Sequence, residues 1–209
     1  IRRILPALTA MVLTTLVVGT IVLYAPNIHD LGEQGIASLL SFANVSHWLI
    51  SGDYWGDTAE TSPLLHTWSL SVEEQFYLFY PLLLIIILKN FHKRLLLVVS
   101  TLCLLSVLFF IYGTKTHPVA TFYLIPTRAW ELGIGALLAI LIFNKNISFT
   151  NNTYLSSLGF LAILLSYLFY NSEDRISPIL VIPVLGTAVI IATTKDNANI
   201  INRGLSLPP

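Results

Sequence analysis

The sequence predicts an all-α fold, a polytopic transmembrane bundle of about six helices. Hydrophobic residues make up 55% of the 209 residues and charged residues only 11%. The mean hydropathy is +0.76. Soluble domains usually carry about 25% charged residues, and several apolar runs here reach the roughly 17–25 residues that a membrane-crossing helix needs.

The apolar runs define six predicted membrane helices. In chain order they are Ile4–Ala25, Leu70–Leu88, Leu95–Tyr112, Thr121–Phe143, Tyr154–Tyr170 and Pro178–Thr194. The first run is too long for the apolar part of a signal peptide and lacks a small-residue cleavage site. The sequence does not begin with methionine, and we expect both ends to lie inside a longer chain.

The basic residues predict how these helices are oriented. Six crossings place eight of the eleven Lys and Arg residues on one side: Arg2, Arg3, Lys89, Lys93, Arg94, Lys145, Lys195 and Arg203. The basic-rich side should be cytoplasmic, which predicts a multi-pass protein of the cell's inner (cytoplasmic) membrane with the lipid bilayer as partner. The net charge is zero, so nothing indicates nucleic-acid binding.

Residues 26–69 form the long loop of this map, and the map places them outside the cell. We expect a short interfacial helix over Leu31–Phe42 and irregular, turn-rich structure in the rest. Trp48, Tyr54 and Trp55 are typical of a membrane–water boundary.

A dense polar cluster follows, where the second helix enters the membrane from outside. It contains His66, Trp68, Glu73, Glu74, Gln75 and Tyr77. Polar groups near membrane depth are costly, so each suggests a function. A structural alternative is a capping box, with Ser71 as N-cap and Glu74 at the third helical position. It leaves Glu73, Gln75 and His66 unexplained, and a hydrated interfacial cluster remains a further alternative.

A second cluster begins the fourth helix and contains Arg128, Trp130 and Glu131. Arg128 and Glu131 are three residues apart and can pair on one helical face, either as part of a site or as a structural salt bridge. Gly133 and Gly135 would allow another helix to approach closely. Both clusters start helices on the outer side, so they can lie near each other.

The remaining candidates have simpler interpretations. Arg2 and Arg3 either anchor the first helix or hold phosphates in bidentate fashion. We expect His29, His47, His92 and His117 to be exposed and Cys103 to be a buried bystander. The sequence shows no metal-ligand spacing and no nucleophile elbow, so we expect no metal and no permanently bound cofactor.

Three of these segments together resemble a known family. The stretches 63–81 (PLLHTWSLSVEEQFYLFYP) and 123–136 (YLIPTRAWELGIGA), with 2–6 (RRILP), resemble the acyltransferase-3 family in order and spacing. The stretch 51–55 (SGDYW) is similar to members that carry a fused extracytoplasmic SGNH domain. The resemblance implies that residues 1–209 are part of a transmembrane domain of about ten helices.

The resemblance also implies an activity. Family members transfer an acyl group, commonly acetyl from acetyl-CoA, to sugars of lipopolysaccharide, peptidoglycan or other surface glycans. Arg2 and Arg3 match positions linked to the donor acyl-CoA. The family's motif of a basic residue, ten intervening residues and a histidine is missing from this sequence, so we expect the catalytic histidine outside the chain and no activity from the chain alone.

On this hypothesis Glu73 or Glu74 orients the acceptor hydroxyl or the histidine, and His66 contributes to the acceptor site. Arg128 and Glu131 shape the cavity, where Trp68, Gln75, Tyr77 and Trp130 bind substrate or support the structure. The rival function is a transporter or flippase, which would show inverted repeats in the full gene. A purely structural membrane subunit would leave the polar cluster unexplained.

Overall fold

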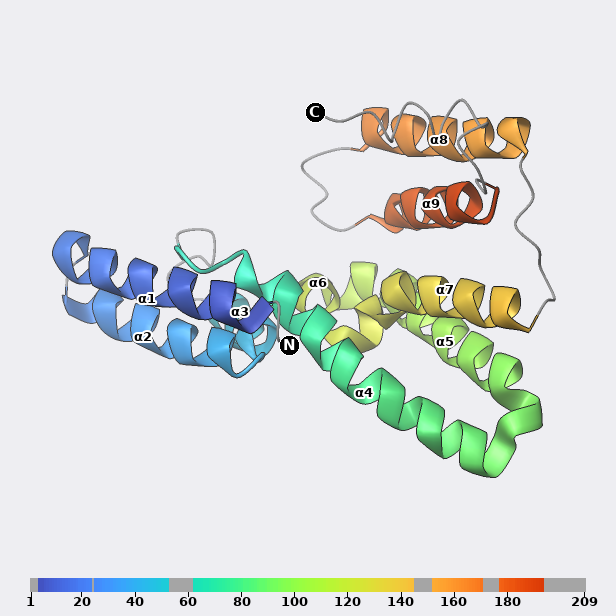
Figure 1. The fold of residues 1–209 in the computed structure, drawn as a ribbon. Helices are drawn as coiled ribbons and strands as arrows, with labels where there is room; N and C mark the ends of the chain where they lie inside the picture. Colours follow the sequence, from blue (N-terminus) through green and yellow to red (C-terminus); the bar gives the residue numbers. More distant parts are fainter. Residues whose placement is uncertain (1–3, 24, 53–61, 145–151, 171–176, 194–209) are drawn as a thin grey trace. The chain divides into compact units, whose positions relative to one another are not determined.

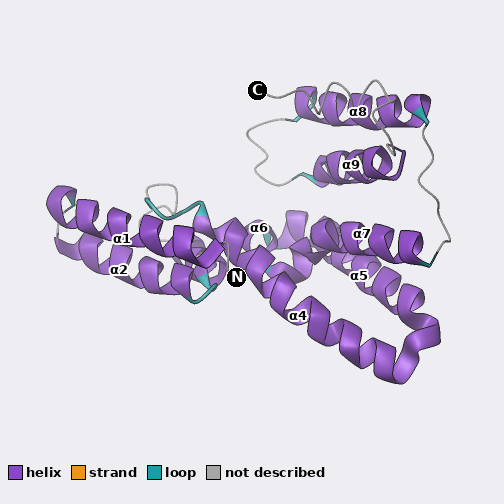
Figure 2. Cartoon of the chain, viewed as in Figure 1, coloured by secondary structure: helices purple, strands orange, loops and turns teal. Residues whose placement is uncertain are grey.

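The structure is a computed structural model that describes residues 4–23, 25–52, 62–144, 152–170 and 177–193 (Figure 1). These residues are helical with short connections and contain no strand (Figure 2). The helices are α1 (Ile4–Val22), α2 (Ala25–Leu39), α3 (Ala43–Gly52), α4 (Thr67–Phe91), α5 (Leu95–Thr116), α6 (Pro118–Tyr123), α7 (Ile125–Phe143), α8 (Thr153–Leu168) and α9 (Val181–Thr193). The all-α prediction is confirmed.

Four stretches of the described chain are long and apolar enough to cross a membrane. They are α1, Thr67–Asn90 within α4, α5, and Pro118–Phe143, which covers α6 and α7. The apolar stretches Thr153–Leu168 and Pro178–Thr193 are shorter. All six predicted segments fall on helical structure, and the chain is a multi-pass helical membrane protein.

The described residues of the predicted outer loop are largely helical, which corrects the sequence interpretation. Helix α2 begins six residues before the expected interfacial helix and ends at Leu39, and α3 was not expected. The buried residues of α2 are Leu31, Gln34, Gly35 and Ser38, which have the spacing of one helical face. Because most of that face is polar or small, hydropathy did not reveal it.

A tight turn joins α2 to α3 and reverses the chain. Ser41 has a positive φ of 60°, the left-handed conformation in which most helices use glycine. The amide of Phe42 donates to the carbonyl of Ala37 at 2.8 Å, the six-to-one hydrogen bond of a Schellman cap. This turn fixes the direction in which α3 leaves α2.

The fourth predicted helix is broken rather than continuous. Helix α6 ends at Tyr123, and Leu124 is extended with φ −90° and ψ 142° before α7 begins. Pro126 provides the reason, because its nitrogen has no hydrogen to donate to the carbonyl of Phe122 four residues earlier.

The chain forms two compact units, which are described separately. The first contains residues 1–86 and 117–128. Its apolar core joins Leu8 and Val12 of α1, Leu31 of α2, and Leu64, which precedes α4. Gly19 of α1 lies directly against the Leu31 side chain, so α1 and α2 pack closely side by side (Figure 1).

The second unit contains residues 87–116 and 129–209. Helices α8 and α9 form a close pair in which a Cβ atom added at Gly159 would lie 2.7 Å from the Gly186 carbonyl oxygen. Gly133 of α7 meets the Cys103 sulfur of α5 in the same way, at 2.5 Å. Gly135 has nothing within 4 Å, so the predicted close approach holds at Gly133 and is wrong at Gly135.

Candidate active site

The polar cluster does not cap a helix, because α4 begins at Thr67, four residues before Ser71. The predicted capping box is therefore wrong. The Ser71 hydroxyl accepts from the Ala43 amide at 3.2 Å, at the first residue of α3. The Glu74 carboxylate accepts from the hydroxyl of Ser41 in the α2–α3 turn. These two side chains thus hold the α2–α3 turn against α4.

A pair of amide side chains forms the centre of the cluster. Gln75 donates to the Asn44 side-chain oxygen at 2.9 Å and to the Ser41 carbonyl at 2.7 Å. Asn44 donates to the Tyr123 carbonyl at 3.2 Å. Asn44 is buried, so these bonds satisfy amide groups that would be costly to leave unpaired. They join α3, α4 and α6 at one point.

The start of α4 is also tied to α2 by side-chain hydrogen bonds. Ser38 and Thr67 share a hydrogen bond between their hydroxyls at 2.8 Å, and both residues are buried. Ser62 donates to the side-chain oxygen of Gln34. The polar residues on the buried face of α2 therefore find partners in the segment that leads into α4.

Aromatic rings extend the cluster towards α6 and α7. Trp68 lies 4.5 Å from Phe122 and 5.5 Å, edge-on, from Tyr123, measured between ring centroids. The Arg128 guanidinium carbon lies 5.1 Å from the Trp68 ring centroid and 5.0 Å from that of Phe122. Such contacts are cation–π interactions. The expectation that the two polar clusters lie close together is confirmed for Trp68 and Arg128.

Arg128 also makes a hydrogen bond that the break between α6 and α7 leaves unmade in the backbone. Its Nε donates to the Phe122 carbonyl at 3.1 Å, and Pro126 has no amide hydrogen to donate to that carbonyl. The Thr127 hydroxyl lies 2.9 Å from the Thr121 carbonyl and 2.8 Å from that of Leu124. The broken backbone is thereby satisfied by side chains, as membrane-embedded breaks require.

The other predicted residues in and just before α4 differ in exposure. Glu73 is half-buried and makes no hydrogen bond or ion pair with the described residues. Tyr77 is 54% exposed. His66 is exposed, and its Nε2 lies 3.0 Å from the Met11 sulfur of α1. Of the two carboxylates in the cluster, Glu73 is thus the one without a described partner, and its role in the reaction stays a prediction.

Trp130 and Glu131 belong to the second unit. Trp130 is fully buried, lies 5.5 Å from Phe110 between ring centroids, and donates its backbone amide to the Ser106 hydroxyl at 3.1 Å. These contacts make Trp130 a packing residue between α5 and α7. Glu131 is half-buried, and its pairing with Arg128 stays a prediction. Arg2 and Arg3 lie outside the described residues.

The sequence interpretation missed His47, which it expected to be exposed. The ring is completely buried in α3. Burial lowers the pKa of His47, and a hydrogen bond with the Leu64 backbone opposes this only partly. Its position one turn after Asn44 on an amphipathic helix was the available signal, but α3 itself was not predicted.

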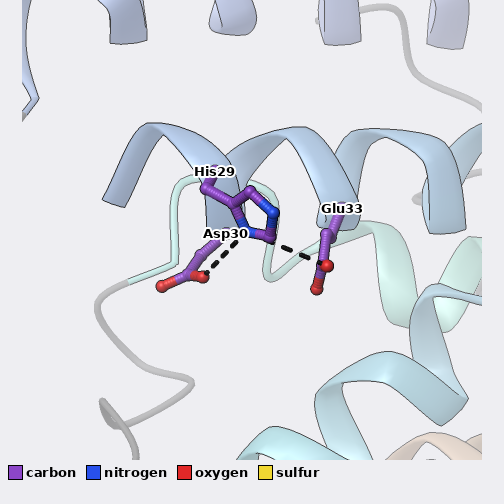
Figure 3. A network of polar contacts seen from close by, with 3 residues as sticks. All are labelled: His29, Asp30 and Glu33. Carbon is purple, nitrogen blue, oxygen red and sulfur yellow. Dashed lines mark ion pairs between the residues drawn. The ribbon is translucent and has the colours of Figure 1, made fainter. Parts of the chain in front are cut away.

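The other histidines fit the expectation where the structure describes their side chains. His117 is exposed. His29 is 75% exposed and lies 3.7 Å from Asp30 and 3.9 Å from Glu33, which are themselves 60% and 71% exposed (Figure 3). Ion pairs this exposed contribute little stability. No group of three or more metal-ligating side chains occurs within the described chain.

Comparison with known proteins assigns the family. A family model described as an acyltransferase domain matches residues 1–207. The chain belongs to the acyltransferase-3 family. It is 32% identical over 210 residues to an uncharacterized protein of Haemophilus influenzae, covering 94% of this chain and 85% of that protein. No solved structure is detectably similar to it.

A named relative adds detail about the family. The chain is 31% identical over 226 residues to the peptidoglycan O-acetyltransferase OatA of Listeria monocytogenes. The match covers all of this chain but only 35% of OatA. The chain therefore spans about a third of the length of OatA, and the stretches 63–81 and 123–136 contribute to the polar network described above.

Proposed function

We propose that the protein containing this chain is an inner-membrane O-acyltransferase. It transfers an acyl group, chiefly acetyl, from acyl-CoA on the cytoplasmic side to a hydroxyl of a cell-surface glycan. The acyltransferase-domain match over residues 1–207 carries this proposal. The name of OatA favours peptidoglycan as acceptor over lipopolysaccharide or exopolysaccharide.

The reaction needs a base and a site for the donor. The acceptor oxygen forms an ester bond to the acyl carbon, while the bond from that carbon to the sulfur of CoA breaks. The hydroxyl proton passes to a general base, and the CoA sulfur leaves as a thiolate that takes up a proton. The family resemblance supplies the base as a histidine outside this chain.

Glu73 is the carboxylate that we assign to orienting that base or the acceptor hydroxyl. It is half-buried and makes no described hydrogen bond, whereas Glu74 is held by Ser41. Trp68, near the start of α4, and Arg128 of α7 form an aromatic and cationic wall. Their cation–π contact, at 5.1 Å, fixes the wall, and the exposed His66 remains a candidate for contact with the acceptor.

The contact between His66 and Met11 supports a site within the membrane thickness. Met11 lies near the middle of α1, about 10 Å along the helix axis from Ile4 at 1.5 Å per residue. The sequence prediction placed the polar cluster at the outer entrance. A deeper position suits a reaction whose donor and acceptor come from opposite sides of the membrane.

Arg2 and Arg3 are proposed to hold the CoA phosphates at the cytoplasmic mouth. The planar guanidinium group binds phosphate through two parallel hydrogen bonds, which lysine cannot reproduce. Replacing both arginines with lysine in the full-length protein keeps the topology signal. We expect acyl transfer to fall and the KM for acetyl-CoA to rise. If the double-lysine protein inserts correctly and transfers acyl groups normally, Arg2 and Arg3 only anchor the first helix in the membrane.

The decisive experiment uses the purified full-length protein in detergent, with labelled acetyl-CoA and, in separate reactions, fragments of peptidoglycan, lipopolysaccharide and exopolysaccharide. We expect label in base-labile ester linkage to the glycan. Detergent removes the two compartments, so a transporter or flippase gives no signal in this assay. Absence of esterified label with each of the three glycan classes, from protein that is folded and monodisperse, would contradict the proposed function.

A further inference from the structure

Helix α2 packs along α1 and runs back in the opposite direction (Figure 1). Leu31, in the first half of α2, lies against Gly19 near the end of α1. Gly35, one turn further along α2, lies against Val12 and Leu16. Each turn of α2 therefore lies nearer the start of α1. Because α1 is long and apolar enough to cross a membrane, a helix packed along it in this way extends into the membrane thickness.

The exposed side chains of α2 change from charged to apolar along this path. In the first half of the helix, Asp30 and Glu33 are exposed. From there to the end of the following turn, the exposed side chains are Ile36, Leu40 and Phe42. No Asp, Glu, Lys or Arg follows Glu33 before residue 53. Charged groups are costly inside a bilayer, so this gradient suits a helix that enters the membrane from the end near Asp30.

The turn after α2 pairs each backbone amide of residues 40–43. The amides of residues 40–42 donate to carbonyls of α2 at 2.8 to 3.2 Å. The amide of Ala43 donates to the Ser71 hydroxyl at 3.2 Å, and the Ser41 carbonyl accepts from Gln75 at 2.7 Å. A turn in water has no such need, because water pairs exposed backbone groups. Irregular backbone at membrane depth, in contrast, occurs where the protein or a water-filled cavity satisfies it.

We propose that α2 is a re-entrant helix, which enters the membrane beside α1 and turns back before crossing it. Its 15 residues are fewer than the roughly 20 that a crossing helix requires. The exposed Ile36, Leu40 and Phe42 then contact lipid acyl chains. Lipid is the partner that we assign to this face, because α1 beside it already exposes apolar residues such as Leu13 at the same depth. The inference concerns position and partner, and it holds whichever reaction the protein catalyses.

A re-entrant α2 also gives the candidate site a support inside the membrane. Ser41 in the turn after α2 binds both Glu74 and Gln75 of α4. His66, just before α4, contacts Met11 near the middle of α1. Two separate contacts therefore place the start of α4 at the depth that α2 reaches.

The test measures depth with a bimane fluorophore on single cysteines in the full-length protein, whose native cysteines are replaced by serine. The protein is reconstituted in phosphatidylcholine vesicles. Ile36→Cys is compared with Leu13→Cys, which marks the middle of α1, and with Asp30→Cys near the start of α2. One quencher is phosphatidylcholine with a nitroxide midway along its acyl chain, and the other is iodide in the water. The lipid nitroxide should quench positions 36 and 13 equally, and iodide quenching should be lost at both. Position 30 should show the reverse.

Two results would overturn the inference. Iodide quenching at position 36 equal to that at position 30 would place α2 on the membrane surface. Quenching by neither reagent at position 36 would show that another helix of the full-length protein, rather than lipid, covers this face. If Ile36→Cys does not yield folded protein, Leu40→Cys addresses the same face and should give the same pattern.

Discussion

At the residue scale, the adjacent carboxylates of α4, Glu73 and Glu74, differ in their contacts. Glu73 and Glu74 are neighbours in sequence, but helical geometry turns their side chains about 100° apart. Glu74 therefore reaches Ser41 in the α2–α3 turn, whereas Glu73 makes no described hydrogen bond. The sequence predicted that Glu73 or Glu74 orients the acceptor hydroxyl or the histidine. It could not say which, because the partner lies 33 residues away.

The two carboxylates can be separated by substitution with glutamine. Glu73→Gln should leave membrane abundance unchanged and lower glycan acylation by roughly a hundredfold, the scale expected for a positioned acid–base group. Glu74→Gln keeps an acceptor for Ser41, so abundance and activity should fall together and only modestly. Acylated glycan and membrane abundance are measured side by side in the full-length enzyme. Near-normal acylation in both variants would place the chemistry entirely outside this cluster.

Ser41 combines a left-handed backbone with a hydroxyl that binds Glu74. Ser41→Gly removes the hydroxyl and relieves the backbone, whereas Ser41→Ala removes the hydroxyl and keeps the strain. The left-handed conformation costs a non-glycine residue about 1–2 kcal/mol. The alanine variant of the purified enzyme should therefore melt at a lower temperature than the glycine variant. Equal melting temperatures would show that the turn does not limit stability.

At the element scale, small residues decide which helices pack closely. Gly159 of α8 and Gly186 of α9 face each other's backbone, and Asn152 makes three hydrogen bonds at the end of the pair. Its side chain accepts from the Tyr154 and Leu155 amides, which caps α8, and its own amide donates to the Thr193 carbonyl at 3.2 Å. Close backbone approach between small residues is a main source of helix association in membranes.

Gly159→Ala should separate α8 from α9, because the added Cβ meets a backbone oxygen at 2.7 Å and backbone cannot yield as a side chain can. Overpacking of this kind costs about 1–3 kcal/mol. Gly135→Ala is the matched control, because its Cβ meets nothing within 4 Å and alanine favours the helix. Thermal stability of the detergent-purified protein should fall for Gly159→Ala and hold or rise for Gly135→Ala. The reverse order would contradict the packing of this pair.

At the scale of the whole molecule, the sequence predicted the elements that hydropathy controls. The long apolar helices appear where expected, to within a few residues at their ends. Helices α2 and α3 were missed because they bury polar side chains such as Gln34, Ser38 and Asn44, each satisfied by a partner distant in sequence. The break at Leu124 was likewise hidden, because Arg128 and Thr127 compensate Pro126 only in the folded chain.

The membrane topology is the prediction that applies to the whole chain. The distribution of Lys and Arg predicts that the stretch around Asp57 lies outside the cell and that the segment around Lys89 to Arg94 lies in the cytoplasm. Cysteines are introduced singly at Asp57, which lies outside the described residues, and at Asn90, an exposed position near the end of α4. The background carries Cys103→Ser, since Cys103 is a free cysteine of α5.

An impermeant thiol reagent applied to intact cells should label the cysteine at 57 and spare the one at 90. Permeabilising the cells should then expose the second site, which shows that protection comes from its location rather than from burial. The opposite labelling pattern would invert the whole map, and with it the proposed sides for acyl-CoA and glycan.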